Sequence, residues 1–157
     1  MKEALRKILD RGDKRILFAG VGNVLRSDDG AGVYIVSQIE PAGNISTILV
    51  EASIENYISK INALSPDVLI IADCIDFNRR PGHTGLVPIK EIKEFDISSH
   101  NISLRRVSDH LKMETYVIGV QPSDLRVGEK LTPVVQRAAD SIISLIRAII
   151  TENQPKK

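Results

Sequence analysis

The sequence predicts an α/β fold, a three-layer α/β/α sandwich around a mainly parallel, twisted sheet of about five strands. Two observations lead to this prediction. Short apolar runs alternate along the chain with stretches in which apolar residues recur every three or four positions, as they do in helices. In addition, the run 68–72 contains no polar residue, which is typical of a strand that helices cover on both faces.

The predicted strands are short runs rich in branched apolar residues. They are Arg15–Val21, Thr47–Val50, Val68–Ala72, Leu86–Ile89 and Tyr116–Val120. The third run is the most apolar and is therefore expected at the centre of the sheet. Pro88 has no N–H to donate to a neighbouring strand, so the fourth run is expected at an edge.

Helices are predicted between these strands from the spacing of apolar residues. They are Lys2–Arg11, about ten residues after Gly30 that end near Pro41, a stretch from Tyr57 to Leu64, a stretch containing Leu104, Val107 and Leu111, and Leu131–Glu152. Pro133 is tolerated in the first turn of the last helix, where its missing N–H costs no hydrogen bond. The tail 153–157 is expected to be flexible.

Length and composition predict one domain over residues 1–157 and disfavour several classes of partner. The 21 basic residues nearly cancel the 20 acidic ones, so the net charge of +1 gives no support for binding nucleic acid. The single cysteine rules out an internal disulfide, and the first residues lack the apolar core of a signal peptide. No uncharged apolar run approaches the roughly 20 residues of a membrane span. We therefore expect a cytoplasmic protein with no membrane insertion.

The segment from Gly20 to Gly32 reads as the end of a strand, a tight loop and the start of a helix. Its Gly-x-Gly pair resembles part of a dinucleotide-binding fingerprint. However, Leu25 stands where a third glycine would allow close packing of the helix on the strand. Nucleotide binding is therefore not the favoured interpretation.

Acidic residues and one histidine are the candidates for a metal site. Asp28 and Asp29 precede a predicted helix, where one carboxylate suffices for capping and the other is available for a cation. Asp73 ends the central strand, where a buried carboxylate is costly unless it is paired or bound to metal. In a parallel sheet these groups and His100 meet at the carboxyl ends of the strands. Two carboxylates and an imidazole suit nickel, zinc or cobalt, with coordination positions left open.

The remaining reactive side chains are weaker candidates. Cys74 follows Asp73, but no His–Cys motif accompanies it, and a free cysteine beside a central strand is usually a small hydrophobic residue. Asp76 is expected at the surface, and His83 and His110 are expected to be exposed or to serve in packing. The sequence has no Gly-x-Ser-x-Gly elbow, which disfavours a serine hydrolase.

The sequence resembles the [NiFe]-hydrogenase maturation endopeptidases in a series of motifs that follow the family's order and spacing over nearly the whole chain. The matching segments are Gly22–Gly32, Ile70–Asp73, Ile97–His100, Ile118–Pro122 and Leu131–Pro133. The segment Glu51–Asn56 further resembles the branch that serves hydrogenases of the formate-hydrogenlyase type, with the usual glycine and proline replaced.

This resemblance implies an endopeptidase that removes the C-terminal peptide of a nickel-loaded large-subunit precursor. The family's nickel-contacting positions fall on Asp29, Asp73 and His100, which leaves Asp28 to cap the helix. The nickel is expected to come with the substrate, although zinc or cadmium can occupy such a site in vitro. Water would attack the peptide bond with Asp29 or Asp73 as candidate general base. Gly22 and Asn23 would offer main-chain and amide donors to the substrate peptide.

Two alternatives remain open at this point. A peptidyl-tRNA hydrolase-like enzyme also begins with an apolar strand and a Gly-x-Gly-Asn turn, but it would have Pro-Gly where this chain has Val24-Leu25. The other alternative is a non-enzymatic metal-binding scaffold module. Activity on a hydrogenase precursor would separate an enzyme from a binding protein.

Overall fold

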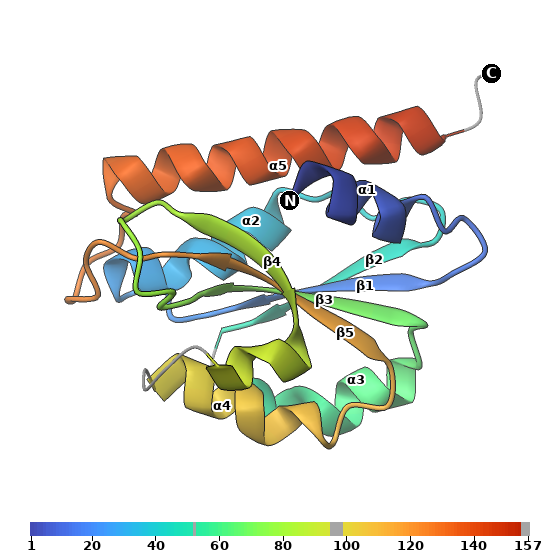
Figure 1. The fold of residues 1–157 in the computed structure, drawn as a ribbon, viewed down its shortest axis with the longest axis horizontal. Helices are drawn as coiled ribbons and strands as arrows, with labels where there is room; N and C mark the ends of the chain where they lie inside the picture. Colours follow the sequence, from blue (N-terminus) through green and yellow to red (C-terminus); the bar gives the residue numbers. More distant parts are fainter. Residues whose placement is uncertain (52, 95–98, 155–157) are drawn as a thin grey trace.

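The fold is built on one five-stranded sheet in the computed structural model, which describes residues 1–51, 53–94 and 99–154 (Figure 1). For residues 93, 94 and 99–103 this description covers the main chain alone. The elements in chain order are α1 (Lys2–Leu9), β1 (Ile16–Val21), the 3-10 helix η1 (Ser27–Gly30), α2 (Ala31–Ser37), β2 (Ile45–Val50), the 3-10 helix η2 (Ile54–Tyr57), α3 (Ile58–Leu64), β3 (Val68–Cys74), β4 (Thr84–Pro88), the 3-10 helix η3 (Ile89–Glu94), α4 (Ser99–Ser108), β5 (Glu114–Val120) and α5 (Pro133–Asn153).

The strand order is β2-β1-β3-β5-β4, and all neighbouring pairs are parallel except β4, which is antiparallel to β5. This order confirms the predicted α/β class and the central position of β3. It also confirms β4 as an edge strand, and Pro88 is its last residue. Parallel pairing brings the carboxyl ends of β1, β2, β3 and β5 to one end of the sheet.

Helices cover both faces of the sheet and form a separate apolar core on each. Helices α1, α2 and α5 lie on one face, and α3 and α4 lie on the other (Figure 1). Alternate side chains of a strand point to opposite faces, so β1 and β3 contribute to both cores. Ile16, Phe18, Val68, Ile70 and Ala72 enter the core beneath α2 and α5, whereas Leu17, Ala19, Leu69 and Ile71 enter the core beneath α3 and α4.

Several helix boundaries differ from those predicted. The helix after the glycine-rich loop has seven residues rather than about ten, because it ends at Ser37 instead of near Pro41, and the N–H groups of Gln38 and Ile39 donate to carbonyls three residues back. The last helix begins at Pro133 instead of Leu131. It also extends to Asn153, whose side-chain NH₂ donates to the carbonyl of Leu9 at 3.1 Å, so the predicted flexible tail does not begin at this residue. Residues 155–157 of that tail lie outside the described residues.

Helix α2 packs directly on the ends of two strands, and Gly32 makes this possible. A Cβ atom at Gly32 would lie 2.1 Å from the carbonyl oxygen of Ala72 and 2.5 Å from that of Val21. Both contacts are far shorter than van der Waals separation, so only glycine fits here. In a dinucleotide-binding fingerprint, the third glycine lets the helix pack closely on the strand. In this chain Gly32, and not the residue at position 25, allows that close packing.

None of the helices described is both long enough and apolar enough to cross a membrane.

Candidate active site

The glycine-rich loop after β1 folds back onto η1. Gly22 has φ +142°, and a Cβ there would lie 1.8 Å from the carbonyl oxygen of Asp29, so a side chain would collide with η1. The main-chain N–H of Asn23 donates to Oδ2 of Asp29 at 3.2 Å. The side-chain oxygen of Asn23 accepts from the N–H of Leu25 at 2.9 Å, which closes an Asx turn. These bonds fix the loop beside Asp29.

Asp29 and Asp73 are both buried, with 5% and 2% of their surfaces exposed. Asp29 belongs to η1, which packs against β3, and Asp73 is the penultimate residue of β3. Oδ1 of Asp73 accepts from the N–H of Cys74 at 2.7 Å. By the alternation along β3, Asp73 points to the same side of the sheet as Ile71, where α4 lies. Two carboxylates therefore lie at the carboxyl end of the sheet.

The third predicted site residue, His100, is the second residue of α4, and its side chain lies outside the described residues. Helix α4 begins at the end of the sheet where β1, β3 and β5 finish (Figure 1). Among the side chains that the structure describes, no three histidine, cysteine, aspartate or glutamate groups are placed to hold a metal ion together. The proposed ligand set of Asp29, Asp73 and His100 therefore remains a prediction, as does the role of Gly22 and Asn23 toward substrate.

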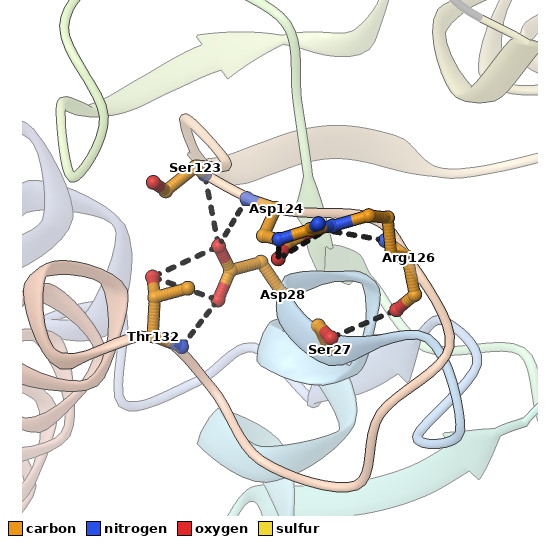
Figure 2. A network of polar contacts seen from close by, with 6 residues as sticks. All are labelled: Ser27, Asp28, Ser123, Asp124, Arg126 and Thr132. Atoms are coloured by element: carbon orange, nitrogen blue, oxygen red, sulfur yellow. Dashed lines mark hydrogen bonds and ion pairs between the residues drawn. The ribbon is translucent and has the colours of Figure 1, made fainter.

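Asp28 does not cap α2, contrary to the prediction. The N-cap residue of α2 is Gly30, without a side-chain bond, because the 3-10 turn places Asp28 two residues before the N-cap. Its fully buried carboxylate turns instead to the connection between β5 and α5 (Figure 2). Oδ2 accepts from the N–H groups of Ser123 at 2.8 Å and Asp124 at 2.9 Å, and Oδ1 accepts from the N–H of Thr132 at 2.7 Å.

Thr132 completes this network with its hydroxyl, which lies 3.1 Å from Oδ1 and 2.9 Å from Oδ2 of Asp28. Sequence reasoning missed the role of Thr132. The only signal was its place in the Leu131–Pro133 motif, and local spacing does not show that this motif lies against residue 28. The partners are separated by 104 positions in the chain.

Cys74 is buried beside these carboxylates and is unsuited to act as a nucleophile. Burial raises the pKa of the thiol well above its usual range, and the negative charges of Asp73, Asp29, Asp28 and Asp76 raise it further. The thiol is therefore protonated at neutral pH. Only a thiolate is an effective nucleophile, so this agrees with the expectation that Cys74 serves in packing.

The other polar residues around this end of the sheet have structural partners. Asp76 is exposed as predicted, and its Oδ1 accepts from the N–H of Asn78 at 2.9 Å and from Nε2 of Gln121 at 3.2 Å. Gln121 also accepts from the N–H of Phe77 at 2.7 Å, so it joins the loop after β3 to the end of β5. His83 is exposed, and its ring lies edge-on to Phe77 with centroids 5.3 Å apart, while His110 is exposed in the turn between α4 and β5.

Comparison with known proteins identifies the family. Residues 35–149 match the family model described as HycI, hydrogenase maturation protease, a range that includes Asp73 and His100 and begins after η1. A protein of Methanocaldococcus jannaschii assigned to the hydrogenase maturation proteases is 30% identical over 145 residues, covering 85% of this chain and 94% of its own length.

Two solved structures share the fold. The endopeptidase HycI from Escherichia coli superposes with a TM-score of 0.73 at 29% identity and covers 82% of this chain and 86% of its own. The [NiFe] hydrogenase maturation protease HycI from Thermococcus kodakarensis gives a TM-score of 0.75 at 25% identity, with 94% and 99% covered. These matches favour the protease over a peptidyl-tRNA hydrolase-like enzyme or a non-enzymatic scaffold. The chain therefore belongs to the family of hydrogenase maturation proteases, which are endopeptidases.

Proposed function

We propose that this protease removes the C-terminal peptide from the precursor of a [NiFe]-hydrogenase large subunit after nickel has been inserted. The family assignment supports a hydrogenase precursor as the substrate, and the relative from Thermococcus kodakarensis is named for [NiFe] hydrogenase. In this proposal the nickel arrives as part of the substrate, and the protease recognises it there.

One observation carries the nickel part of the proposal. Two buried carboxylates, Asp29 from η1 and Asp73 from β3, lie at the end of the sheet where α4 begins with Ser99 and His100. Two like charges with little access to water cost free energy, and a cation brought by the substrate reduces that cost. Carboxylate oxygens with an imidazole nitrogen form a donor set that a borderline ion such as nickel accepts. Asp29, Asp73 and His100 would then select the loaded precursor.

The chemistry proposed for the site is hydrolysis by water. A carboxylate of the pair, Asp29 or Asp73, accepts a proton from the attacking water while the water oxygen bonds to the carbonyl carbon. The C–N bond then breaks, and the proton passes to the leaving amine. A buried carboxylate is suited to this step because its position is fixed by main-chain donors, the N–H of Asn23 for Asp29 and that of Cys74 for Asp73.

The first test compares nickel-loaded with nickel-free precursor as substrate. We expect cleavage of the loaded precursor alone, detected as a mobility shift of the large subunit and as release of the C-terminal peptide by mass spectrometry. Cleavage of both forms at equal rates would contradict recognition of nickel. Cleavage of neither form would contradict the proposed function as a whole.

Single substitutions test the three site residues. Asp29→Asn, Asp73→Asn and His100→Ala should each lower the cleavage rate by about 100-fold or more, the usual effect of losing a group that acts in the transition state. Asp109→Asn and His110→Ala are matched controls, because both residues are exposed and lie in the turn after α4. Full processing by the Asp73→Asn variant would remove Asp73 from the site.

A further inference from the structure

The Asp28 carboxylate is buried in η1 but is bonded to a distant part of the chain. Ser123, Asp124 and Thr132 are 95, 96 and 104 positions away. Both carboxylate oxygens face N–H groups, which can donate but cannot accept. The side chain at position 28 must therefore present two acceptor oxygens. An isosteric asparagine would bring its own NH₂ group against at least one of these donors.

The segment held by Asp28, residues 123–132, is bonded to η1 and the glycine-rich loop mainly through its main chain. The N–H of Ser27 donates to the carbonyl of Gly128 at 2.8 Å, and the N–H of Gly128 donates to the carbonyl of Leu25 at 2.9 Å. The hydroxyl of Ser27 donates to the carbonyl of Arg126 at 2.8 Å (Figure 2). The 123–132 segment is thereby fixed next to the residue that precedes Asp29.

Two apolar side chains of the same segment face solvent. Leu125 is 37% exposed and Val127 is 89% exposed, beside the exposed Leu25 of the glycine-rich loop. Exposed apolar side chains on a fixed main chain gain contact area with an apolar part of a peptide, at no cost for ordering the segment during binding. If the segment were mobile, each binding event would have to order it, and affinity would fall.

We propose that Asp28 is a positioning residue that holds the 123–132 segment beside Asp29 as a fixed wall against which the substrate peptide lies. This inference rests on the proposed function. Asp28 acts through the main chain of its partners and does not itself touch the substrate. Its loss should therefore weaken substrate binding more than it slows the cleavage step.

The test uses the full-length protein and nickel-loaded precursor. Thr132→Val removes one hydroxyl donor and keeps the N–H, whereas Thr132→Ser keeps both and is the matched conservative variant. We expect Thr132→Val to raise KM by about three- to tenfold with kcat changed less than about twofold, and Thr132→Ser to restore the wild-type KM. Asp28→Asn should raise KM further, because it places a donor against donors.

Limited trypsin digestion provides a readout that does not depend on activity. The Arg126 side chain is 89% exposed and bonds Asp124, so trypsin reaches it once the main chain of the segment can open. Cleavage after Arg126 and Lys130, identified by mass spectrometry, should be faster in Asp28→Asn and Thr132→Val than in the wild type or Thr132→Ser.

Two results would overturn the role of Asp28. One is a lowered melting temperature in Asp28→Asn and Thr132→Val with an unchanged KM, which would mean a purely structural bond network. The other is unchanged trypsin cleavage in both variants. If Asp28→Asn fails to fold, the comparison of Thr132→Val with Thr132→Ser, in KM and in trypsin cleavage, tests the proposal by itself. If the wild type does not cleave the precursor, the proposed function is contradicted. If all variants cleave it with the same KM, only the role of Asp28 is contradicted.

Discussion

At two places in the candidate site, neighbouring residues of the chain face different parts of the fold. Asp28 faces the N–H groups of the 123–132 segment, whereas Asp29 accepts from the N–H of Asn23. Asp73 points toward the side of the sheet that carries α4, and Cys74 points to the other side. A shift by one position would exchange these environments. The partners of each carboxylate therefore depend on its position within its helix or strand as much as on its chemistry.

At the residue scale we predict that Cys74→Ala keeps full processing activity. The thiol is 2% exposed and its pKa is raised by burial and by nearby carboxylates, so it offers no thiolate to a substrate. The substitution should lower the free energy of unfolding by about 1 kcal/mol, a common value for a single substitution. Precursor cleavage and urea unfolding measure the two effects.

Thiol labelling supplies the control for this prediction. In native buffer at pH 7, Cys74 should react with a thiol reagent only as fast as the protein unfolds, whereas in urea it should react at once. Rapid labelling of the native protein, or loss of cleavage in Cys74→Ala, would contradict the assignment of Cys74 to packing.

At the scale of elements, the contact between α2 and the strand ends is the most constrained feature of the fold. A Cβ at Gly32 would meet the carbonyl oxygens of Ala72 and Val21, and main-chain atoms at strand ends cannot easily move. We predict that Gly32→Ala lowers the free energy of unfolding by about 3 kcal/mol or more and also slows cleavage, because η1 and Asp29 shift with α2. Chemical denaturation and kcat measure these effects.

Gly12→Ala is the matched control for this element. A Cβ at Gly12 would meet no atom within 4 Å, so its stability should stay within about 0.5 kcal/mol of the wild type. Equal stability of the two variants would show that α2 can move away from the strand ends.

At the scale of the whole molecule, the two ends of the sheet carry different sets of side chains. The carboxyl end carries Asp29 and Asp73, whereas the amino end carries a surface network that ties the chain before β1 to the start of β5. There Nη1 of Arg11 lies 2.6 Å from Oε2 of Glu114, and the hydroxyl of Tyr116 donates to Oε1 of Glu114. Changes to this network should alter stability and leave cleavage unchanged.

Glu114→Gln tests this separation through its pH dependence. The hydrogen bond from Tyr116 and the interaction with Arg11 lower the pKa of Glu114 below its ordinary value of 4.5. A carboxylate with a lowered pKa in the folded state stabilises the protein above its unfolded pKa, and this contribution is lost as the pH falls through the folded value. The side chain is 44% exposed, so the difference at pH 7 should be at most about 1 kcal/mol.

The measurement is the free energy of unfolding of wild type and Glu114→Gln from pH 7 down to pH 3. The difference between them should shrink below pH 4.5, while precursor cleavage at pH 7 is unchanged. Glu40→Gln, at an exposed position, serves as the control for removing a surface carboxylate. A difference that grows toward acid pH would contradict the sign assigned to Glu114.

The sequence predicted the features that depend on local pattern. The apolar run of β3 indicated a central strand, Pro88 indicated an edge, and the position of Asp73 after an apolar run indicated a buried carboxylate at the end of the central strand. The bond between Asp28 and Thr132 was not predictable, because it joins residues 104 positions apart through the three-dimensional fold. The role of Gly32 was missed for the same reason, since its need for space arises from the carbonyl of Ala72.

The 123–132 segment is held almost entirely by bonds to its main chain, and this has a consequence for evolution. Asp28 and Ser27 bind N–H and carbonyl groups that nearly every residue type possesses, so the exposed side chains at positions 125 and 127 can change while the segment stays in place. In the proposed role of this segment as a wall for the substrate peptide, substrate preference can diverge by substitution at these positions with little change in stability. Such a segment is a natural target for redirecting a maturation protease toward a different precursor.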